Sequence, residues 1–225
     1  MNRTSKPISA EDTLNLMANL LVPSATVFRT TKVQPELDRF ENDAEHSFLL
    51  ATLGCAIAQQ MSPALDLGKV SQYALVHDLV EAYAGDTTIW ASSEEHASKA
   101  EREDEALRLI EERFGKRFPW IDRTIKKYEL FDEPESCFVY ALDKIIPYIV
   151  MAAVDHQPFP PHEELYEEKM EVARKKIARY PQLLDLFEDL DADYKKRPHF
   201  FQAGDRLSSI AALETGSLTY NAPSK

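Results

Sequence analysis

The chain has 225 residues, of which 44% are hydrophobic and 28% charged, and its formal net charge at pH 7 is -12. This length allows a sizeable hydrophobic core, and the composition is that of an ordinary globular protein. The acidic excess argues against broad binding to a nucleic-acid polymer or to an anionic membrane, because both need a basic surface. It is compatible with a small anionic substrate, since a bound cation and one or two arginines reverse the local field.

Cysteine content and hydropathy indicate the compartment. Cys55 and Cys137 lie in apolar helical patterns, and two cysteines cannot form a disulfide framework. The first ten residues lack the apolar stretch of a signal peptide, and no window reaches the ~18 apolar residues of a membrane span. We therefore expect a cytoplasmic protein that does not bind membranes.

The first helical pattern of the chain begins after Ser9. Asp12 follows three residues later, as in a capping box, in which each side chain accepts a hydrogen bond from the other residue's backbone amide. The expected buried face of this helix consists of Leu14, Met17, Leu20 and Leu21. Residues 22–43 contain two prolines and predict an irregular connection, and no strand-like alternation of useful length is found in the chain.

Apolar residues with the period of an α-helix dominate the chain beyond residue 43. The expected helices span residues 44–61, 67–84, 92 or 93–114, 120–128, 135–155, 162–179 and 181–194. Gly85 is placed to end the second of these. Residues 135–155 are apolar almost all round, as expected of a central helix, and Pro147 should kink it. The sequence predicts an all-α protein: one compact helical domain over residues 1–197, followed by a tail, 198–225, of weak periodicity.

Asp143 is the most informative single residue, because it lies on the apolar face that Val139, Ile146 and Val150 form. Burial of an unpaired carboxylate costs several kcal/mol unless a cation, a hydrogen-bond network or a proton compensates it. Lys144 is adjacent in sequence but points about 100° away on a helix, which makes it a poor partner. A bound cation is one of the remaining explanations.

The helix expected over residues 67–84 poses the same problem, because His77, Asp78 and Glu81 interrupt its apolar side. These side chains are three and four residues apart and therefore share one patch. A divalent cation would offset their repulsion and desolvation. His46, at the start of the preceding helix, supplies a second imidazole. Mixed imidazole and carboxylate ligation suits Mn, Fe, Co, Ni or Zn, with weaker support for Mg.

Each of these residues also has an ordinary structural explanation. A buried histidine such as His46 is more often a satisfied core residue than a ligand, and a His-Asp dipeptide frequently arises by chance. The set as a whole favours a metal site, because otherwise each member is an unrelated polar defect in an apolar face.

The order His46, His77-Asp78, Asp143 resembles that of the HD-domain superfamily, whose members are metal-dependent phosphohydrolases. Three segments are similar to the motifs of bacterial 5′-deoxynucleotidases: RFENDAEHS at 39–47, ALVHDLVEA at 74–82 followed by Gly85-Asp86, and ALDK at 141–144. The resemblance covers a motif core of about residues 14–155. Residues 162–194 would then be additional C-terminal helices.

This resemblance implies a role for each matching position. His46, His77, Asp78 and Asp143 would be the metal ligands, and Glu81 and Asp86 would orient or deprotonate the attacking water. For substrate phosphate, Arg39 is the best-matched arginine and Arg29 is another. Arg29 could instead be a solvated loop residue, and Arg39 could pair with Glu41 or Asp43.

One part of the nucleotidase pattern is missing. An Arg-Trp or Gly-Trp pair that lies upstream of the first histidine in these relatives is not found over residues 27–40. Trp90 could stack on a base, although an aromatic residue at such a position more often serves packing.

The expected activity is phosphate release from a nucleotide, and specifically from a deoxynucleoside 5′-monophosphate. The alternatives are hydrolysis of a nucleoside triphosphate or another small phosphoester, and a non-catalytic helical module in which the metal is structural. Relatives form homodimers, so a homodimer is also expected from the resemblance.

Overall fold

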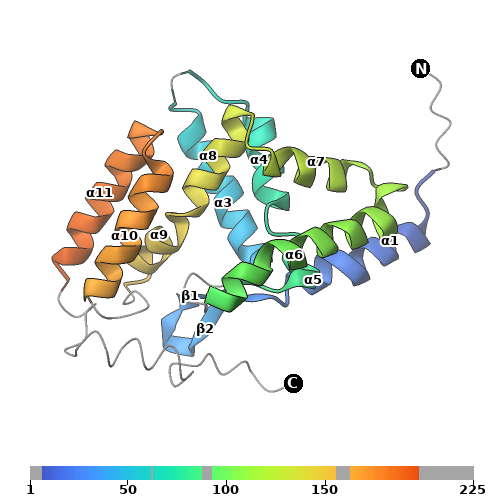
Figure 1. The fold of residues 1–225 in the computed structure, drawn as a ribbon, viewed down its shortest axis with the longest axis horizontal. Helices are drawn as coiled ribbons and strands as arrows, with labels where there is room; N and C mark the ends of the chain where they lie inside the picture. Colours follow the sequence, from blue (N-terminus) through green and yellow to red (C-terminus); the bar gives the residue numbers. More distant parts are fainter. Residues whose placement is uncertain (1–6, 62, 88–92, 156–162, 198–225) are drawn as a thin grey trace.

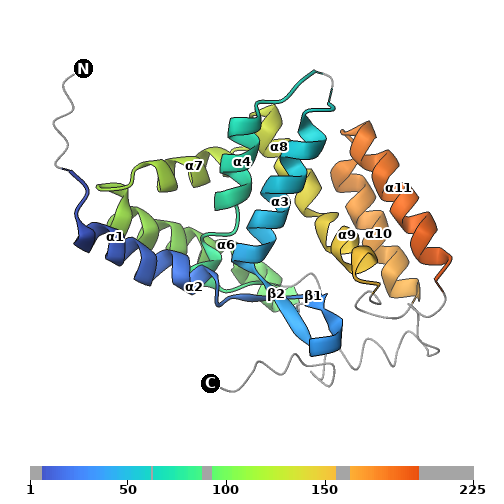
Figure 2. The ribbon, with the colours of Figure 1, turned by 180° about the vertical axis from the view of Figure 1, so that it is seen from behind.

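Eleven helices and a short β-hairpin make up the described part of the chain, residues 7–61, 63–87, 93–155 and 163–197 of a computed structural model (Figure 1). The helices are α1 Ala10–Leu16, α2 Val22–Ser24, α3 Asp43–Ala58, α4 Leu67–Val76, α5 Glu81–Ala84, α6 Ser93–Ile110, α7 Trp120–Glu129, α8 Pro134–Asp143, α9 Ile146–Ala153, α10 Glu163–Ile177 and α11 Pro181–Lys195. Helices α3, α4 and α8 lie between the α10–α11 pair and a group formed by α1, α6 and α7 (Figures 1 and 2). The predicted all-α class is confirmed. The predicted tail, 198–225, lies outside the described residues, so the domain boundary stays a prediction.

A β-hairpin replaces most of the irregular connection expected over residues 22–43. Strand β1 (Phe28–Gln34) pairs antiparallel with β2 (Arg39–Asn42) through a short 3₁₀ turn, and Asp38 adopts a left-handed conformation with φ 52°. The expectation that no strand would form was wrong. This hairpin carries few apolar residues and its register is irregular, so it lacks the alternation by which strands are recognised.

The N-terminal helix is capped as predicted but buries a different face. Ser9 Oγ accepts a hydrogen bond from Asp12 N at 3.1 Å, and Asp12 Oδ2 accepts one from Ser9 N at 2.9 Å. Leu20 is fully buried, whereas Leu14 and Met17 are 66% and 47% exposed. The helix continues into a π-helical turn, Met17–Leu21. Such a turn holds an extra residue, which rotates the later positions relative to the earlier ones.

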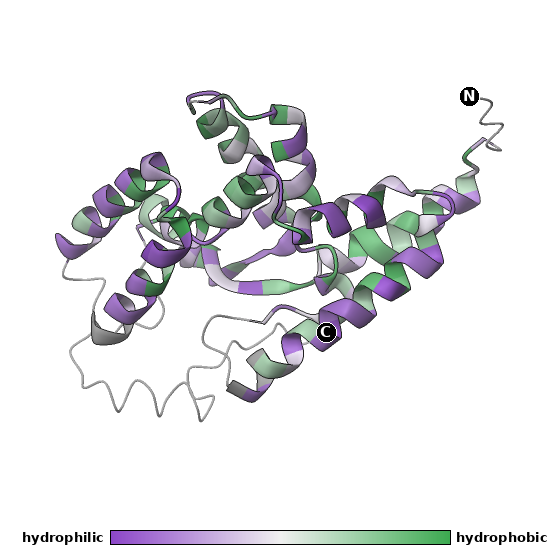
Figure 3. Ribbon diagram, turned by 45° about the horizontal axis from the view of Figure 1, so that its top comes forward, coloured by the Kyte–Doolittle hydropathy of each residue, from purple (hydrophilic) through white to green (hydrophobic). Residues whose placement is uncertain are grey.

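Two clusters of buried side chains hold the helices together. The larger one joins α3, α4, α8, α9, α10 and α11, and its fully buried members include Leu50, Phe138 and Leu142. The smaller one joins the Met17–Leu21 turn to α6 and α7 through residues such as Leu20 and Ile110. The outer helices carry hydrophilic residues along their outward sides (Figure 3). The polar site described below lies between these clusters, at the ends of α3, α4 and α8.

Gly54 sets the close approach of the central helices. A Cβ atom at this position would lie 3.3 Å from Val70 Cγ1 of α4 and 3.4 Å from Leu142 Cδ2 of α8. These distances are tight for a side chain in a packed interior. The small residue therefore lets α3 lie against both partners, which brings the three helix ends together.

Two expected long helices are each divided in the structure. Residues 67–84 form α4 and α5, separated by tight turns, and residues 135–155 form α8 and α9, which meet at 43°. Pro147 occupies the first turn of α9, so the kink predicted at this residue is confirmed, although the helix is also interrupted just before it. In the described residues no single helix is long and apolar enough to cross a bilayer. Helices α8 and α9 reach that length and composition only when they are counted together.

Replacement of the central residue Leu142 by alanine should lower the free energy of unfolding by ~2–5 kcal/mol, because a cavity forms among three helices. Urea unfolding followed by circular dichroism measures this change. The matched control is Leu130→Ala, at a leucine that is 67% exposed, for which a change within about 0.5 kcal/mol is expected. Equal effects at both positions would contradict the assignment of the core.

Candidate metal centre

The N-terminus of α3 presents the first two site residues. Asn42 caps the helix, with its Oδ1 atom accepting a hydrogen bond from Glu45 N at 3.0 Å, and Glu45 Oε2 accepts one from Asn42 N at 3.2 Å. This capping box fixes where the helix begins. Asp43 and His46 then lie on the same buried face of α3 as Leu50. His46 is about one turn beyond Asp43, and Leu50 is about one turn beyond His46.

A local tightening of the chain after α4 positions the next three site residues, His77, Asp78 and Glu81. Leu79 N donates to Val76 O at 3.1 Å and Glu81 N donates to Asp78 O at 2.9 Å, so the helical ladder changes from four-residue to three-residue spacing. Such a change inside a helix often marks a functional hinge or a strained stretch of sequence. It directs His77 and Asp78 toward α3 and α8, while Asp78 stays grouped with Glu81, their carboxylate oxygens lying within 4.8 Å of each other.

The four predicted metal ligands converge. His46 Nε2 lies 2.9 Å from Asp143 Oδ1, and His77 Nε2 lies 3.7 Å from the same oxygen. Asp78 Oδ2 lies 2.9 Å from His77 Nε2. Ligand atoms of His46, His77 and Asp143 are all within 4.8 Å of one another, and all three residues are buried. Side chains that are up to 97 positions apart in the chain thus meet at one point.

The outer nitrogen of each imidazole is held by an acceptor. Glu41 Oε2 lies 3.3 Å from His46 Nδ1, and Ala74 O lies 2.9 Å from His77 Nδ1. A carboxylate and a carbonyl only accept, so Nδ1 is the donor in both contacts. Both rings therefore direct Nε2 to the common point, which is the arrangement of metal-binding histidines. Glu41 was not recognised as an orienting residue in the sequence, where only its position within the RFENDAEHS motif marks it.

Buried polar atoms without hydrogen bonds show that these residues suit a cation. His77 Nε2 lies 2.9 Å from Asp78 Oδ2 but without hydrogen-bond geometry, and both carboxylate oxygens of Asp43 and Oε2 of Glu81 also lack hydrogen bonds. Buried polar atoms without partners cost ~1–3 kcal/mol each, and more when charged. A divalent ion held by His46, His77, Asp78 and Asp143 would satisfy the imidazole and offset the carboxylate charge. This mixed donor set fits a first-row transition metal.

The pKa shifts express the same imbalance of charge. Burial lowers the pKa of His77, but the carboxylates of Asp78 and Asp143 outweigh it and raise the pKa to about 10. Burial and the neighbouring carboxylate of Asp78 raise the pKa of Glu81 to about 10 and that of Asp43 to about 7. Without a cation, protons therefore compensate part of the negative charge.

Arg29 and Arg39, the two predicted phosphate-binding residues, lie in different places. Arg29, on β1, lies inside the site: its Nη1 atom donates to Asp78 Oδ2 at 2.7 Å, and its Nη2 atom is 4.0 Å from Asp143 Oδ1. Arg39 donates to Glu45 Oε1 at 2.6 Å and to Gln34 Oε1 at 2.8 Å, away from the pocket. Its ion-pair partner is thus Glu45, and neither Glu41 nor Asp43.

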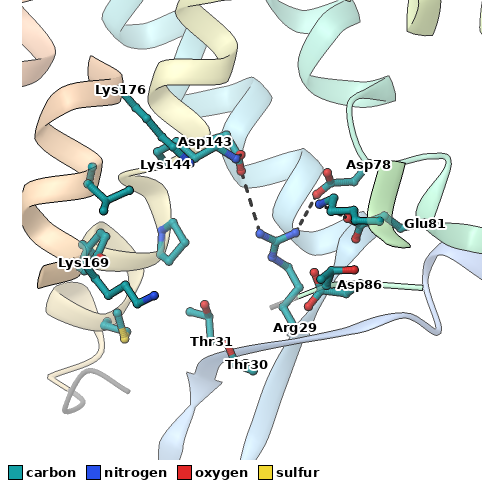
Figure 4. Close-up of a pocket in the computed structure, with 17 residues that line it drawn as sticks. Arg29, Thr30, Thr31, Asp78, Glu81, Asp86, Asp143, Lys144, Lys169 and Lys176 are labelled. Atoms are coloured by element: carbon teal, nitrogen blue, oxygen red, sulfur yellow. Dashed lines mark hydrogen bonds and ion pairs between the residues drawn. The ribbon is translucent and has the colours of Figure 1, made fainter. Parts of the chain in front are cut away.

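A pocket of about 440 Å³ opens beside the ligands and is lined by Arg29, Asp78, Glu81, Asp86 and Asp143 at one end (Figure 4). The predicted catalytic residues Glu81 and Asp86 both belong to this lining. Gly85, with φ 75°, ends α5 in a conformation that glycine adopts without strain, and Asp86 follows it. Asp43 joins Asp78 and Glu81 in a second group of carboxylates. The sequence analysis did not single out Asp43 as a site residue.

One expectation about Asp143 was wrong. Lys144 Nζ donates to Asp143 Oδ2 at 2.6 Å, although adjacent residues on a helix point apart. Helix α8 ends at Asp143, and Lys144 lies in the break before α9. The break frees the long lysine side chain to fold back on its neighbour.

Comparisons with known proteins identify the family. The profile of the HD domain family matches residues 25–184, which include all four predicted ligands. The chain belongs to the HD domain family. The crystal structure of a protein described as a predicted metal-dependent phosphohydrolase, from Magnetospirillum magnetotacticum MS-1, superimposes with a TM-score of 0.64 at 24% identity, covering 88% of this chain and 99% of the other. No curated protein matches the sequence significantly.

Family membership confirms the resemblance at the level of the superfamily, and with it an HD-type hydrolase that uses a divalent metal. The narrower resemblance to 5′-deoxynucleotidases is not decided by it. Trp90, considered for base stacking, lies outside the described residues.

Glu41→Gln should weaken metal binding ~10–100-fold, because the amide holds the His46 ring less firmly than the carboxylate does. Calorimetric titration of the metal-stripped chain with Mn²⁺ or Zn²⁺ measures the affinity. Glu36→Gln, at an exposed position of the same hairpin, serves as the control and should bind as the wild type does. Unchanged affinity in Glu41→Gln would contradict the orienting role.

Proposed function

We propose that this HD domain protein hydrolyses phosphate monoesters of nucleotides, specifically of deoxynucleoside 5′-monophosphates. The observation that carries the proposal is the convergence of two imidazoles and two carboxylates at the end of an open pocket, with Arg29 beside them. The narrower substrate rests on the similarity of residues 39–47, 74–82 and 141–144 to bacterial 5′-deoxynucleotidases. The name of the Magnetospirillum protein, a predicted metal-dependent phosphohydrolase, agrees with the wider reaction.

The metal residues and the water-handling residues have separate tasks. His46, His77, Asp78 and Asp143 hold the divalent ion, which, when bound, polarises a phosphoryl oxygen and makes a water more acidic. Glu81 and Asp86 line the pocket next to Asp78, where they orient the attacking water and take its proton. The water oxygen forms a bond to phosphorus while the ester P–O bond breaks, and the leaving oxygen receives a proton.

Arg29 is the residue that we assign to the substrate phosphate. Burial opposes its charge, but the surrounding carboxylates, Asp78 first among them, raise its pKa, so the guanidinium stays charged. Its planar donors match two phosphate oxygens at once. Negative charge that grows on the phosphoryl group during reaction is stabilised by such a fixed donor.

A non-catalytic metal module is less well supported than an enzyme. A structural ion needs a closed shell of ligands, whereas this site adjoins a 440 Å³ pocket that Glu81 and Asp86 also line. Hydrolysis of triphosphates or of other small phosphoesters uses the same ligands and differs only in the substrate. A cytoplasmic location and a homodimer stay predictions.

Metal-stripped protein, resupplied with Mn, Co, Mg or Zn, should release orthophosphate from deoxynucleoside 5′-monophosphates. The panel should include ribonucleoside monophosphates and triphosphates, and Asp143→Ala should lose both activity and metal content. Asp132→Ala, at an exposed carboxylate, is the matched control. Tripolyphosphate as a product would move the assignment to triphosphohydrolases, and full activity of Asp143→Ala would overturn the metal site.

Arg29→Lys should lower kcat/KM for the best monophosphate ~10–100-fold while metal content is retained. Lysine keeps the positive charge near Asp43 and Asp78 but loses the two-point contact, which is worth roughly 1.5–3 kcal/mol for a charged hydrogen-bonding group. Steady-state kinetics and metal analysis on the same preparation measure both quantities. Arg39→Lys is the comparison, and a larger loss there than at position 29 would assign the phosphate to Arg39.

A further inference from the structure

The wall of the pocket that faces away from Glu81 and Asp86 is basic. Lys169 and Lys176 come from α10, and Lys144, from the break between α8 and α9, lies nearer the metal end, where it pairs with Asp143 at 2.6 Å (Figure 4). Figure 4 shows Lys169 and Lys176 on the opposite side of the pocket from Asp86, with Arg29 between them. The carboxylates among the described lining residues all belong to the metal end: Asp78, Glu81, Asp86 and Asp143.

One stripe of α10 forms this wall. Lys169, Val172, Ala173 and Lys176 are spaced i, i+3, i+4 and i+7, which places them on one helical face, and all four line the pocket. The other basic residues of α10 have acidic partners elsewhere: Arg174 Nε is 2.7 Å from Glu188 Oε1 of α11, and Lys175 Nζ is 3.3 Å from Glu171 Oε1. Lys176 makes no ion pair with any residue that the structure describes.

Like charges oppose one another on this wall. Partial burial, followed by the nearby charge of Lys144, lowers the pKa of Lys176; Lys99 and Lys169 act in the same direction, and Asp143 opposes them. An anion bound between Lys169 and Lys176 would reduce this repulsion. Such a grouping of lysines is also unexpected in a chain of net charge -12, in which acidic residues are abundant.

The pocket is also lined by less polar side chains, namely Pro147, Tyr148, Met151 and Val172. A volume of about 440 Å³ lies within the usual range for sites that hold a small organic ligand. The pocket thus offers a metal end, apolar contacts and a cationic wall.

From this arrangement we infer that the α10 wall is a second phosphate subsite, so that the favoured substrate carries two phosphate groups. The metal end hydrolyses one phosphate, and Lys169 and Lys176 hold the other without reacting with it. A nucleoside 3′,5′-bisphosphate has this chemistry, with its sugar and base available for the apolar contacts of the pocket. The inference rests on the proposed phosphohydrolase activity and narrows its substrate class.

The test compares a nucleoside 5′-monophosphate with the 3′,5′-bisphosphate of the same nucleoside, using the full chain loaded with Mn²⁺ at constant ionic strength. For the wild type, kcat/KM should be at least about tenfold higher for the bisphosphate, equivalent to ~1.4 kcal/mol. Lys169→Gln and Lys176→Gln should each lower this ratio toward one. Lys175→Gln, on the solvent side of the same helix, should keep the wild-type ratio.

The ratio of the kcat/KM values for the two substrates does not change when part of the protein is inactive. A partly unfolded variant therefore does not imitate the expected result. Equal kcat/KM values for the two substrates in the wild type, or a ratio unchanged in both lysine variants, would overturn the second subsite and leave the proposed hydrolase intact. Absence of turnover with every substrate would instead contradict the proposed function. Calorimetric binding of the same two compounds then decides the subsite: tighter binding of the bisphosphate that both variants lose supports it, and equal affinity rejects it.

Discussion

Uncompensated negative charge at the meeting point of α3, α4 and α8 is the constraint on which the other features of the site depend. Asp43, Asp78, Glu81 and Asp143 come together with little solvent, and proteins rarely bury carboxylates in this way without partners. Two imidazoles and the guanidinium of Arg29 supply part of the positive charge, but polar atoms without hydrogen bonds are left over. A divalent cation would compensate the remaining negative charge. The ion that stabilises these buried side chains would then also be the ion that the hydrolytic reaction needs.

Each local feature of the backbone around the site orients one or two of its side chains. The capping box of Asn42 and Glu45 fixes the start of α3, and therefore the direction of His46. Three-residue turns after α4 aim His77 and Asp78, and the end of α8 places Asp143 at a break in the chain. Acceptors behind the imidazoles then select the nitrogen that faces the centre. The hydrophobic clusters on either side hold these helix ends in register.

The pocket has a distribution of charge that the total composition conceals. The chain has a large acidic excess, yet one arginine and four lysines of its described part lie around this cavity beside four carboxylates, so the cavity is less acidic than the molecule as a whole. Helix α10 contributes to this balance through the lysines of the stripe that faces the cavity. Residues outside the motif core therefore shape the site, which gives the C-terminal helices a role beyond packing.

The sequence by itself determined the all-α class and pointed to four candidate metal ligands, because helical periodicity and polar residues on apolar faces are local properties that can be read residue by residue. The kink at Pro147 follows from equally local chemistry. Only the tertiary structure decided that Arg29 enters the site while Arg39 pairs with Glu45, since their positions depend on a hairpin with no regular alternation of apolar residues. The same holds for Glu41, Asp43 and the lysines of α10. Their roles arise from contacts between segments far apart in the chain, and no local pattern encodes such distances.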